Sequence, residues 1–446
     1  MTTPSDPEKA EEFQALLAEL PSNDSASASD VPKNDKKRRF WHFLLYSLTC
    51  ALFALGILSR STGFNRPGCR SIGQDQARYS TTQCLDSVNF TTITTPQGEG
   101  SPYRAHTSIS LPVFAKELSF VARGDLSYGT FQISQSGDAG SEAVVDIDVS
   151  YHQPEVLGNA TMCRLHPSRG KWGFGIFVGP HPNWSSAEIV QKLRVDINVR
   201  LPANIDTGKP VRVQGLRTYL PHYLHAIQDL SQSVDFGKVQ LTSHDGGIAA
   251  ESLRADAIKI ESRIGPITGT YNATRVLVLD TANAPIMVRA NLLGGDDHVV
   301  RLFIKTSNGL IDSQVGLYSN ASDATGGTFV VSARTANSPL KLTFVDAPVD
   351  SALHATMGTS NSPAQVTLHE TYEGSFSLLS STFFRPAVEW DKDPEDPAGR
   401  GRERTVKVNA VKDSLVTGDV FWGEKEAKEK GSVSVETSNS PLRLIL

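Results

Sequence analysis

Short stretches of alternating apolar and polar residues recur along the C-terminal half of this 446-residue chain. In residues 340–344 (LKLTF), leucine and phenylalanine alternate with lysine and threonine, and residues 432–437 (SVSVET) show the same period of two. Alternation of this kind places one set of side chains in a core and the other set toward solvent. The pattern therefore predicts β-strands, and residues 300–304 (VRLFI) fit it as well.

A five-residue motif, Thr-[Ser/Ala]-Asn-[Gly/Ser/Ala]-[Pro/Leu], separates these predicted strands. It occurs at 281–285, 306–310, 335–339, 359–363 and 437–441, and weaker copies lie at 242–248 and 262–267. The first four asparagines are 25, 29 and 24 residues apart, a period typical of stacked β-repeats. The repeat-turn asparagines are Asn283, Asn308, Asn337, Asn361 and Asn439.

The motif has the chemistry of a tight turn at the start of a strand. A residue before proline is restricted to extended conformations, and a strand tolerates proline at its first position. Asparagine accepts the left-handed conformation better than most residues, so we expect the motif asparagines to adopt that conformation in these turns. If the repeats stack, the asparagine amides can hydrogen-bond from one repeat to the next as a ladder.

The predicted fold class is all-β, with a β-solenoid or stacked β-repeat array at 203–390 that resumes at 405–446. A β-rich lead-in domain is expected at 106–202, where AVVDIDVSYH and LRVDINVRLP alternate. The alternative is that this region forms the irregular first coils of the array and caps its end. Residues 391–404 (DKDPEDPAGRGRER) are charged and rich in proline and glycine, which indicates a surface loop. The alternative fold is a pair of β-sandwiches with similar hairpin turns.

An apolar run at 40–58 contains no Asp, Glu, Lys or Arg and is about 28 Å long as a helix, enough for one transmembrane helix. Basic residues are concentrated just before it, so the positive-inside rule predicts a type II signal-anchor with a mostly disordered cytosolic tail at 1–39. A Gly-, Ser- and Thr-rich stalk is expected at 59–105. The basic residues are Lys33, Lys36, Lys37, Arg38 and Arg39.

Sequons for N-glycosylation agree with this topology, because five of them follow the predicted anchor. The ectodomain is therefore expected to be a glycoprotein that lies outside the cell or in the lumen of the secretory pathway. The acceptor residues would be Asn89, Asn159, Asn183, Asn272 and Asn320.

The four cysteines are too few for a disulfide scaffold. Cys69 and Cys84 flank a Ser/Thr-rich stretch in the predicted stalk, and they could close a small loop or pair between chains. No cysteine–histidine spacing fits a zinc site, and no cofactor is expected. A formal net charge of −5 argues against a nucleic-acid partner.

The series LRVDINVRLP, LTSHDGG, IESRIGPITG, LDTANAPI, IKTSNGLI and VETSNSPL resembles uncharacterised fungal single-pass membrane proteins. Their repeats are similar to bacterial adhesin-like β-repeat proteins whose domain has no assigned function. The resemblance covers residues 105–446 and implies a β-solenoid-like ectodomain behind one membrane anchor, with no catalytic residues. The long interval between Asn361 and Asn439 departs from a regular array.

Asp146-Ile-Asp148 and Asp391-Lys-Asp393 have the Asp-x-Asp form with which many glycosyltransferases hold a metal and a nucleotide sugar. However, Asp146 and Asp148 also fit the polar face of a strand. Nucleotide-sugar folds alternate strands with helices, and that pattern is nearly absent here.

A β-helix glycan hydrolase would need clustered carboxylates. The nearest candidates are Asp296 and Asp297 beside His298, within a predicted loop. Histidines near other turns are further candidates for ligands, although local hydrogen bonding explains them as well: His222, His225 and His244, the last followed by Asp245.

The outward positions of the predicted strands carry cations with apolar neighbours, a mixture suited to a polysaccharide or a protein ligand and also to plain solvent exposure. The sequence therefore favours a membrane-anchored, adhesin-like protein with a non-enzymatic binding or structural role; the alternative is a glycan-modifying enzyme of the secretory pathway. The outward set is Arg289, Arg301, Lys305, Arg334, Lys341 and Arg443, with Met287, Phe303 and Ile445.

Overall fold

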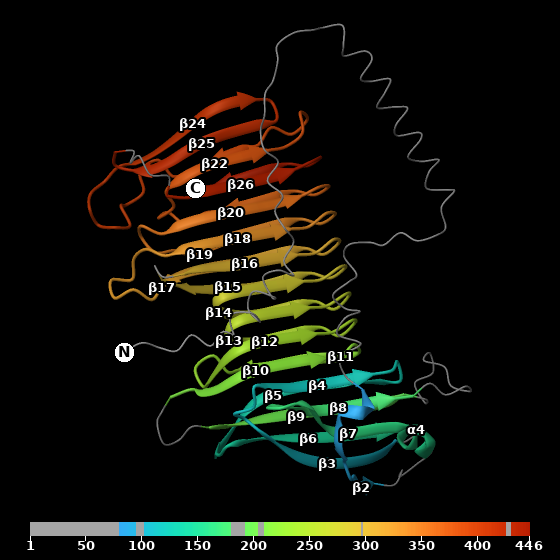
Figure 1. The fold of residues 1–446 in the computed structure, drawn as a ribbon. Coiled ribbons are helices and arrows are strands. Elements are labelled where there is room, and N and C mark those ends of the chain that lie inside the picture. The colour runs from blue at the N-terminus through green and yellow to red at the C-terminus, as the bar shows by residue number, and fades with distance from the viewer. Residues whose placement is uncertain (1–79, 95–101, 180–191, 204–208, 296–297, 425–429) are drawn as a thin grey trace, which may run out of the picture. The chain divides into compact units, whose positions relative to one another are not determined.

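The computed structural model describes residues 80–94, 102–179, 192–203, 209–295, 298–424 and 430–446. In these residues the chain is nearly all β, and its 27 strands belong to one hydrogen-bonded sheet (Figure 1). Two short helices accompany them, η1 (Thr81–Gln83) and α4 (Pro154–Gly158). The sheet lies in a compact unit, Ser71–Leu446.

Most of the sheet consists of two columns of parallel strands, and each repeat contributes one strand to each column. The first column holds the strands that lead into the turns. Its order is β8 (Lys171–Val178), β4 (Glu117–Arg123), β10 (Val211–Tyr219), β12 (Val234–Thr242), the later halves of β13 (Ile248–Glu261) and β14 (Ile267–Asp280), β16 (Val299–Lys305), β18 (Thr328–Arg334), β20 (Ala352–Thr359), β26 (Ser432–Thr437) and β22 (Gly374–Leu379).

The second column holds the strands that leave the turns. Its order is β9 (Leu193–Ala203), β5 (Ser127–Ala139), β11 (Tyr223–Asp229), the earlier halves of β13 and β14, β15 (Ile286–Gly294), β17 (Ile311–Ser319), β19 (Leu340–Asp346), β21 (Ala364–Thr367), β27 (Leu442–Ile445) and β23 (Ala387–Glu389). The strands on either side of an asparagine turn, such as β16 and β17, pair with the equivalent strands of neighbouring repeats and form no hairpin.

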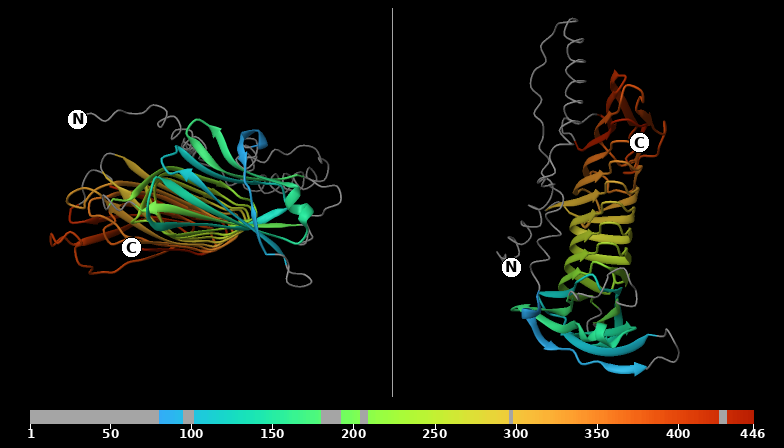
Figure 2. Two further views of the ribbon diagram at one scale, coloured as in Figure 1. Left: turned by 90° about the horizontal axis from the view of Figure 1, so that it is seen from below. Right: turned by 90° about the vertical axis from the view of Figure 1, so that its right-hand side faces the viewer.

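Antiparallel strands close both ends of the columns, as the side view in Figure 2 shows. At the end nearer the N-terminus, β7 (Ala160–Ser168) and β1 (Cys84–Ser87) follow β8, while β6 (Glu142–Tyr151), β3 (Tyr103–Pro112) and β2 (Thr91–Thr94) follow β9. At the other end, β25 (Leu415–Trp422) and β24 (Arg404–Lys412) follow β22. Atypical end strands of this kind cap a repeat array, which would otherwise present an open edge.

At both ends a later strand is inserted between two earlier ones. β9 lies between β5 and β6, while β26 lies between β20 and β22. The chain therefore leaves the array after β21, forms the cap, and returns to fill the gap. This insertion explains the long interval between the last two asparagine motifs.

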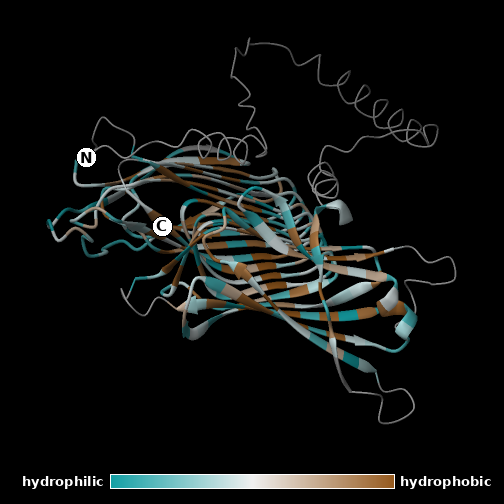
Figure 3. Cartoon of the chain, turned by 60° about the horizontal axis from the view of Figure 1, so that its bottom comes forward, coloured by the Kyte–Doolittle hydropathy of each residue, from teal (hydrophilic) through white to brown (hydrophobic). Residues whose placement is uncertain are grey.

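The core lies between the columns, and a single hydrophobic cluster extends from Ala105 to Leu446. The predicted alternation is observed: Leu302, Ile304, Leu340 and Leu342 are buried, whereas Lys341 is exposed. Figure 3 shows the same alternation of hydrophobic and hydrophilic residues along the strands. Because the cluster is continuous, residues 106–202 and the repeat array share one core.

The predicted stalk at 59–105 already contains η1, β1, β2 and the start of β3. Within it, Cys84 forms a disulfide with Cys163 of β7, with their Cα atoms 5.5 Å apart. The suggested Cys69–Cys84 pairing is therefore wrong for Cys84, because the pairing of β1 with β7 brings Cys163 beside it. Cys69 lies outside the described residues.

Residues 391–403 form the expected irregular loop between β23 and β24. The loop is held by ion pairs, since Arg402 contacts both Asp396 and Glu373. The predicted cytosolic tail and membrane span at 1–58 lie outside the described residues. Within the part of the chain that the structure describes, no helix combines the length and the apolar character needed to cross a membrane.

Candidate binding face

The five motif asparagines lie one above another at the corner between the two columns, and all are exposed. The last four each donate a hydrogen bond from Nδ2 to the Oδ1 of the asparagine in the preceding repeat, so that Asn283 is the acceptor at the start of the ladder. The donor–acceptor distances are 2.6 Å (Asn308 to Asn283), 2.7 Å (Asn337 to Asn308), 2.7 Å (Asn361 to Asn337) and 3.3 Å (Asn439 to Asn361).

The threonine that opens each motif is buried and holds the corner from inside. The Thr306 hydroxyl donates to the Ala284 carbonyl of the preceding repeat at 3.3 Å and accepts the Gly309 N–H at 3.0 Å. The N–H groups of Ser307 and Asn308 both donate to the Ala282 carbonyl. Backbone N–H and carbonyl groups in a turn that faces the core need hydrogen-bond partners, and the neighbouring repeat supplies them.

The expected left-handed conformation of the asparagines is wrong. Among the described non-glycine residues, only Ala324 and Asp350 have positive φ. The hydrogen bonds between successive turns form the corner without requiring that conformation.

The weaker motif copies continue the same corner. The N–H groups of Arg263 and Ile264 donate to the His244 carbonyl, and the N–H of Ala282 donates to the Arg263 carbonyl. Histidine, aspartate, arginine and isoleucine therefore occupy the corner below the asparagines. Here His222 Nδ1 lies 2.9 Å from Asp245, and Arg263 Nη1 donates to His244 Nε2 at 3.0 Å.

The predicted outward residues divide between two different faces. Met287 and Arg289 on β15 are exposed on the second column, together with Lys341 and Arg443; we call this surface the second-column face. Along it, Arg289 is in register with Gln314 of β17 and with Thr270 of β14. Lys341 Nζ lies 3.8 Å from Asp312, and Arg443 pairs with Glu389. Ile445 lies on the same face, half-buried.

Arg301, Phe303, Lys305 and Arg334 lie instead on the outer side of the first column. Lys305 is in register with Asp280 and Arg334. Burial raises the pKa of Asp280 to about 6, against the opposing effect of Lys305. The sequence contained the signal for this division, because Arg301, Phe303, Lys305 and Arg334 precede a turn in the chain, whereas the residues of the second-column face follow one.

The Asp-x-Asp pairs do not form a shared metal site. His106 Nδ1 lies 2.9 Å from the Asp148 carboxylate. Asp146 accepts a hydrogen bond from the Ser108 hydroxyl at 2.9 Å and pairs with Arg200 at 2.8 Å. Asp391 and Asp393 are exposed in the charged loop. In the described residues, no group of three histidine, cysteine or acidic side chains could hold a metal ion.

His225 lies away from the other candidate histidines. Its side chain is fully buried, with Nε2 2.8 Å from the Thr218 hydroxyl, and burial lowers its pKa to about 4. His298 Nε2 lies 2.9 Å from the Thr274 carbonyl, whereas Asp296 and Asp297 are outside the described residues.

The sequon asparagines differ in the use of their amide nitrogen, the atom that a glycan would modify. Asn159 Nδ2 donates to the Gly179 carbonyl, and Asn272 Nδ2 donates to Ser252 and to the Leu253 carbonyl. Asn89 and Asn320 are exposed in connections between strands. Asn183 lies outside the described residues.

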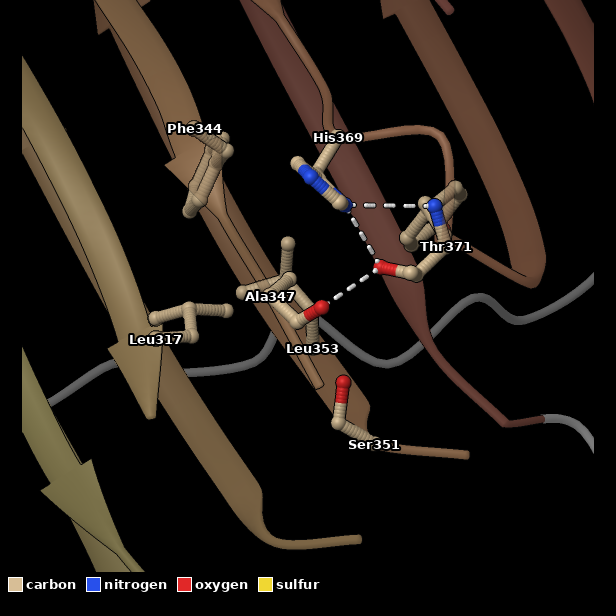
Figure 4. Close-up of a pocket in the computed structure, with 8 residues that line it drawn as sticks. Leu317, Phe344, Ala347, Ser351, Leu353, His369 and Thr371 are labelled. Atoms are coloured by element: carbon tan, nitrogen blue, oxygen red, sulfur yellow. Dashed lines mark hydrogen bonds between the residues drawn. The ribbon is translucent and has the colours of Figure 1, made fainter. Parts of the chain in front are cut away.

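The hollows in the described part of the chain include a small void and an open groove. The small void of about 10 Å³ lies beside Leu317, Phe344 and His369, where the His369 ring contacts Thr371 (Figure 4). This volume is at the lower limit of the space that holds one water molecule. The other hollow is an open groove of about 370 Å³ beside Asp86 and Arg164. The sequence did not indicate it, because strand pairing alone brings these two residues together.

The chain matches no protein family and no curated protein. Solved structures with weak likeness include a "putative cell adhesion protein" from Clostridium sporogenes, at 10% identity and a TM-score of 0.17, covering 77% of this chain and 99% of that one. A "putative adhesin" from Parabacteroides merdae has 13% identity and a TM-score of 0.20, covering 61% and 93%. Both bacterial proteins are adhesion proteins by name. Their TM-scores are too low to assign a role to any residue of this chain.

Proposed function

We propose that this chain is an adhesin-like protein whose β-solenoid ectodomain binds a polysaccharide or a protein through the second-column face. The proposal includes the type II anchor at 40–58 and the relation to fungal membrane-anchored proteins that the motif series suggested. In this arrangement residues after 58 lie outside the cell or in the lumen of the secretory pathway. The role is binding or structural, without a catalytic step.

The observation that carries the proposal is the second-column face itself. Parallel neighbours hold its side chains in rows about 4.8 Å apart, so it is an extended surface with little freedom of its own. Arg289 is exposed and has no ion-pair partner in the described residues, with Gln314 and Met287 beside it. A guanidinium in this setting suits a carboxylate or sulfate group, which it can bind with two hydrogen bonds.

The anchor is supported by sequence alone, through the apolar run and the basic residues before it. The disulfide between Cys84 and Cys163 fits the same placement, because disulfides persist in oxidising compartments.

The binding proposal can be tested with full-length protein in nanodiscs, on arrays of acidic and neutral polysaccharides and of surface proteins. A double variant, Arg289→Ala with Lys341→Ala, should weaken binding about tenfold or more, as expected when central charged contacts are lost. The matched control is Arg301→Ala with Lys305→Ala on the first column. Equal binding by both double variants would refute the role of the second-column face.

The topology can be tested with tags at the two termini in intact and permeabilised cells. We expect the C-terminal tag to be protected or extracellular, and the N-terminal tag to be cytosolic. Recovery of both tags on the cytosolic side would refute the type II arrangement.

A further inference from the structure

The groove of about 370 Å³ lies beside β1, the first described strand of the sheet. Residues 86–89, which comprise the end of β1 and the start of its connection to β2, form one wall, and residues 107–110 of β3 form the other. Arg164 of β7 closes one side. The disulfide of Cys84 fixes the first wall, because it ties β1 to β7.

One edge of β3 is left open along this groove. β2 pairs with β3 only at Arg104, Ala105 and His106, and upstream of Thr91 the chain turns away toward β7. On this side, residues 107–110 have no strand partner in the described part of the chain. An open edge invites pairing with another chain, and proteins usually cover or interrupt it.

Asn89 lies in the wall that faces this edge. It is exposed, and its side-chain amide forms no hydrogen bond within the described residues, unlike the amides of Asn159 and Asn272. The sequon is completed by Thr91, which is exposed at the start of β2. The free amide nitrogen of Asn89 therefore lies in the connection that forms one wall of the groove.

The groove has the polar chemistry that a sugar requires. Arg164 donates to Asp86 from Nε at 3.1 Å and from Nη2 at 2.8 Å, and its guanidinium lies 5.7 Å from the Trp172 ring. Ser108 and Ser110 are exposed on the same strand, and the Ser108 hydroxyl donates to Asp146 at 2.9 Å. A few fixed polar groups beside a partly apolar wall, in a volume of this size, are typical of small-ligand sites.

We propose that the groove holds the first sugars of an N-linked glycan carried by Asn89, and that this glycan covers the open edge of β3. The inference rests on the proposed function, since the glycan requires an ectodomain in the secretory pathway. A tethered ligand has an effective concentration in the millimolar range, so a groove of modest affinity suffices.

The test uses the full chain produced in a eukaryotic secretory pathway. Endoglycosidase release in the native state is compared between Asn89 and Asn320, and hydrogen exchange is measured at residues 107–110. Thr91→Ala removes the sequon, and Thr91→Ser, the matched control, retains it. Ser110→Trp fills the groove and leaves the sequon intact.

We expect release at Asn89 to be about tenfold slower than at Asn320 in the native protein, and equal after unfolding. Ser110→Trp should abolish the difference, and Thr91→Ala should speed exchange at 107–110 relative to Thr91→Ser. A bare Asn89, equal native release at both sites, or unchanged exchange in Thr91→Ala would each overturn the inference. If Asn320 is also bare, the proposed lumenal location fails with it; if Asn320 is glycosylated, only the groove inference fails.

Discussion

Asn439 donates a hydrogen bond to Asn361 at 3.3 Å, although 78 residues separate them in the sequence. The intervening chain forms the cap, and the last repeat returns to stack directly on the repeat of Asn361. The asparagine ladder is therefore continuous in space while its sequence period is interrupted. Its last and longest bond joins the two repeats that are farthest apart in the chain.

The asparagines in the middle of the ladder should contribute more to the stability of the array than the asparagine at its end. Asn337→Ala removes two hydrogen bonds of 2.7 Å, so we expect a loss of about 1–2 kcal/mol in the free energy of unfolding. Asn439→Ala removes one longer bond at the end of the ladder and should cost less. Urea unfolding of both variants measures the difference. An Asn337→Ala protein as stable as the parent would show that the ladder contributes nothing.

The buried threonine hydroxyls should matter more than the exposed amides. Thr306→Val keeps the shape but leaves the Gly309 N–H and the Ala284 carbonyl without their partner, at a cost of about 1–3 kcal/mol. Thr306→Ser retains the hydroxyl and is the control. The two midpoints of unfolding should differ clearly; if Thr306→Val and Thr306→Ser unfold together, the hydroxyl is not a structural contact.

Peptide mapping without reduction should link Cys84 to Cys163. The bridge closes a loop over a sequence separation of 79 residues, for which chain entropy predicts about 4 kcal/mol of stabilisation. Cys163→Ser should therefore destabilise β1 and β7, detected as faster proteolysis near residue 84, while Cys69→Ser should leave it unchanged. A Cys69–Cys84 peptide in the digest would contradict this assignment.

The buried His225 and the half-buried Asp280 should give opposite pH dependence of stability. His225 titrates near 4 in the folded chain and at about 6.5 when unfolded, so its contribution is present above pH 6.5 and is lost as the pH falls toward 4. Asp280 has a folded pKa of about 6, raised from 3.8, so its contribution is present below pH 3.8 and is lost as the pH rises through 6. Each pKa shift changes the free energy of unfolding by about 3 kcal/mol or less.

The two effects oppose each other between pH 4 and pH 6.5, so single variants are needed to separate them. Relative to the parent, His225→Gln should gain stability as the pH is lowered, and Asp280→Asn should lose it. Urea midpoints at pH 4.5, 5.5 and 7 would show these slopes. Parallel curves for the parent and both variants would mean that neither group titrates differently on folding.

The sequence by itself determined which side chains face the core. Residues such as Leu302 and Leu342 alternate with polar neighbours, and the period of a strand turns that alternation into an inside and an outside. The repeated turn also indicated that the asparagines would meet. The first feature depends on residues close together in the chain, and the second on the repetition of one motif, so the sequence pattern was enough for both.

Only the tertiary structure decided which strands became neighbours. The period of two does not specify a partner, so the insertion of β9, the bridge from Cys84 to Cys163, and the groove between residues 86–89 and 107–110 left no pattern in the sequence. The long interval before Asn439 marked an interruption of the array, but it did not indicate that β26 would lie between β20 and β22. The outward cations were identified correctly as exposed or half-buried, but they lie on two faces. A side chain's face follows from its own strand, whereas a binding surface depends on the strands stacked beside it.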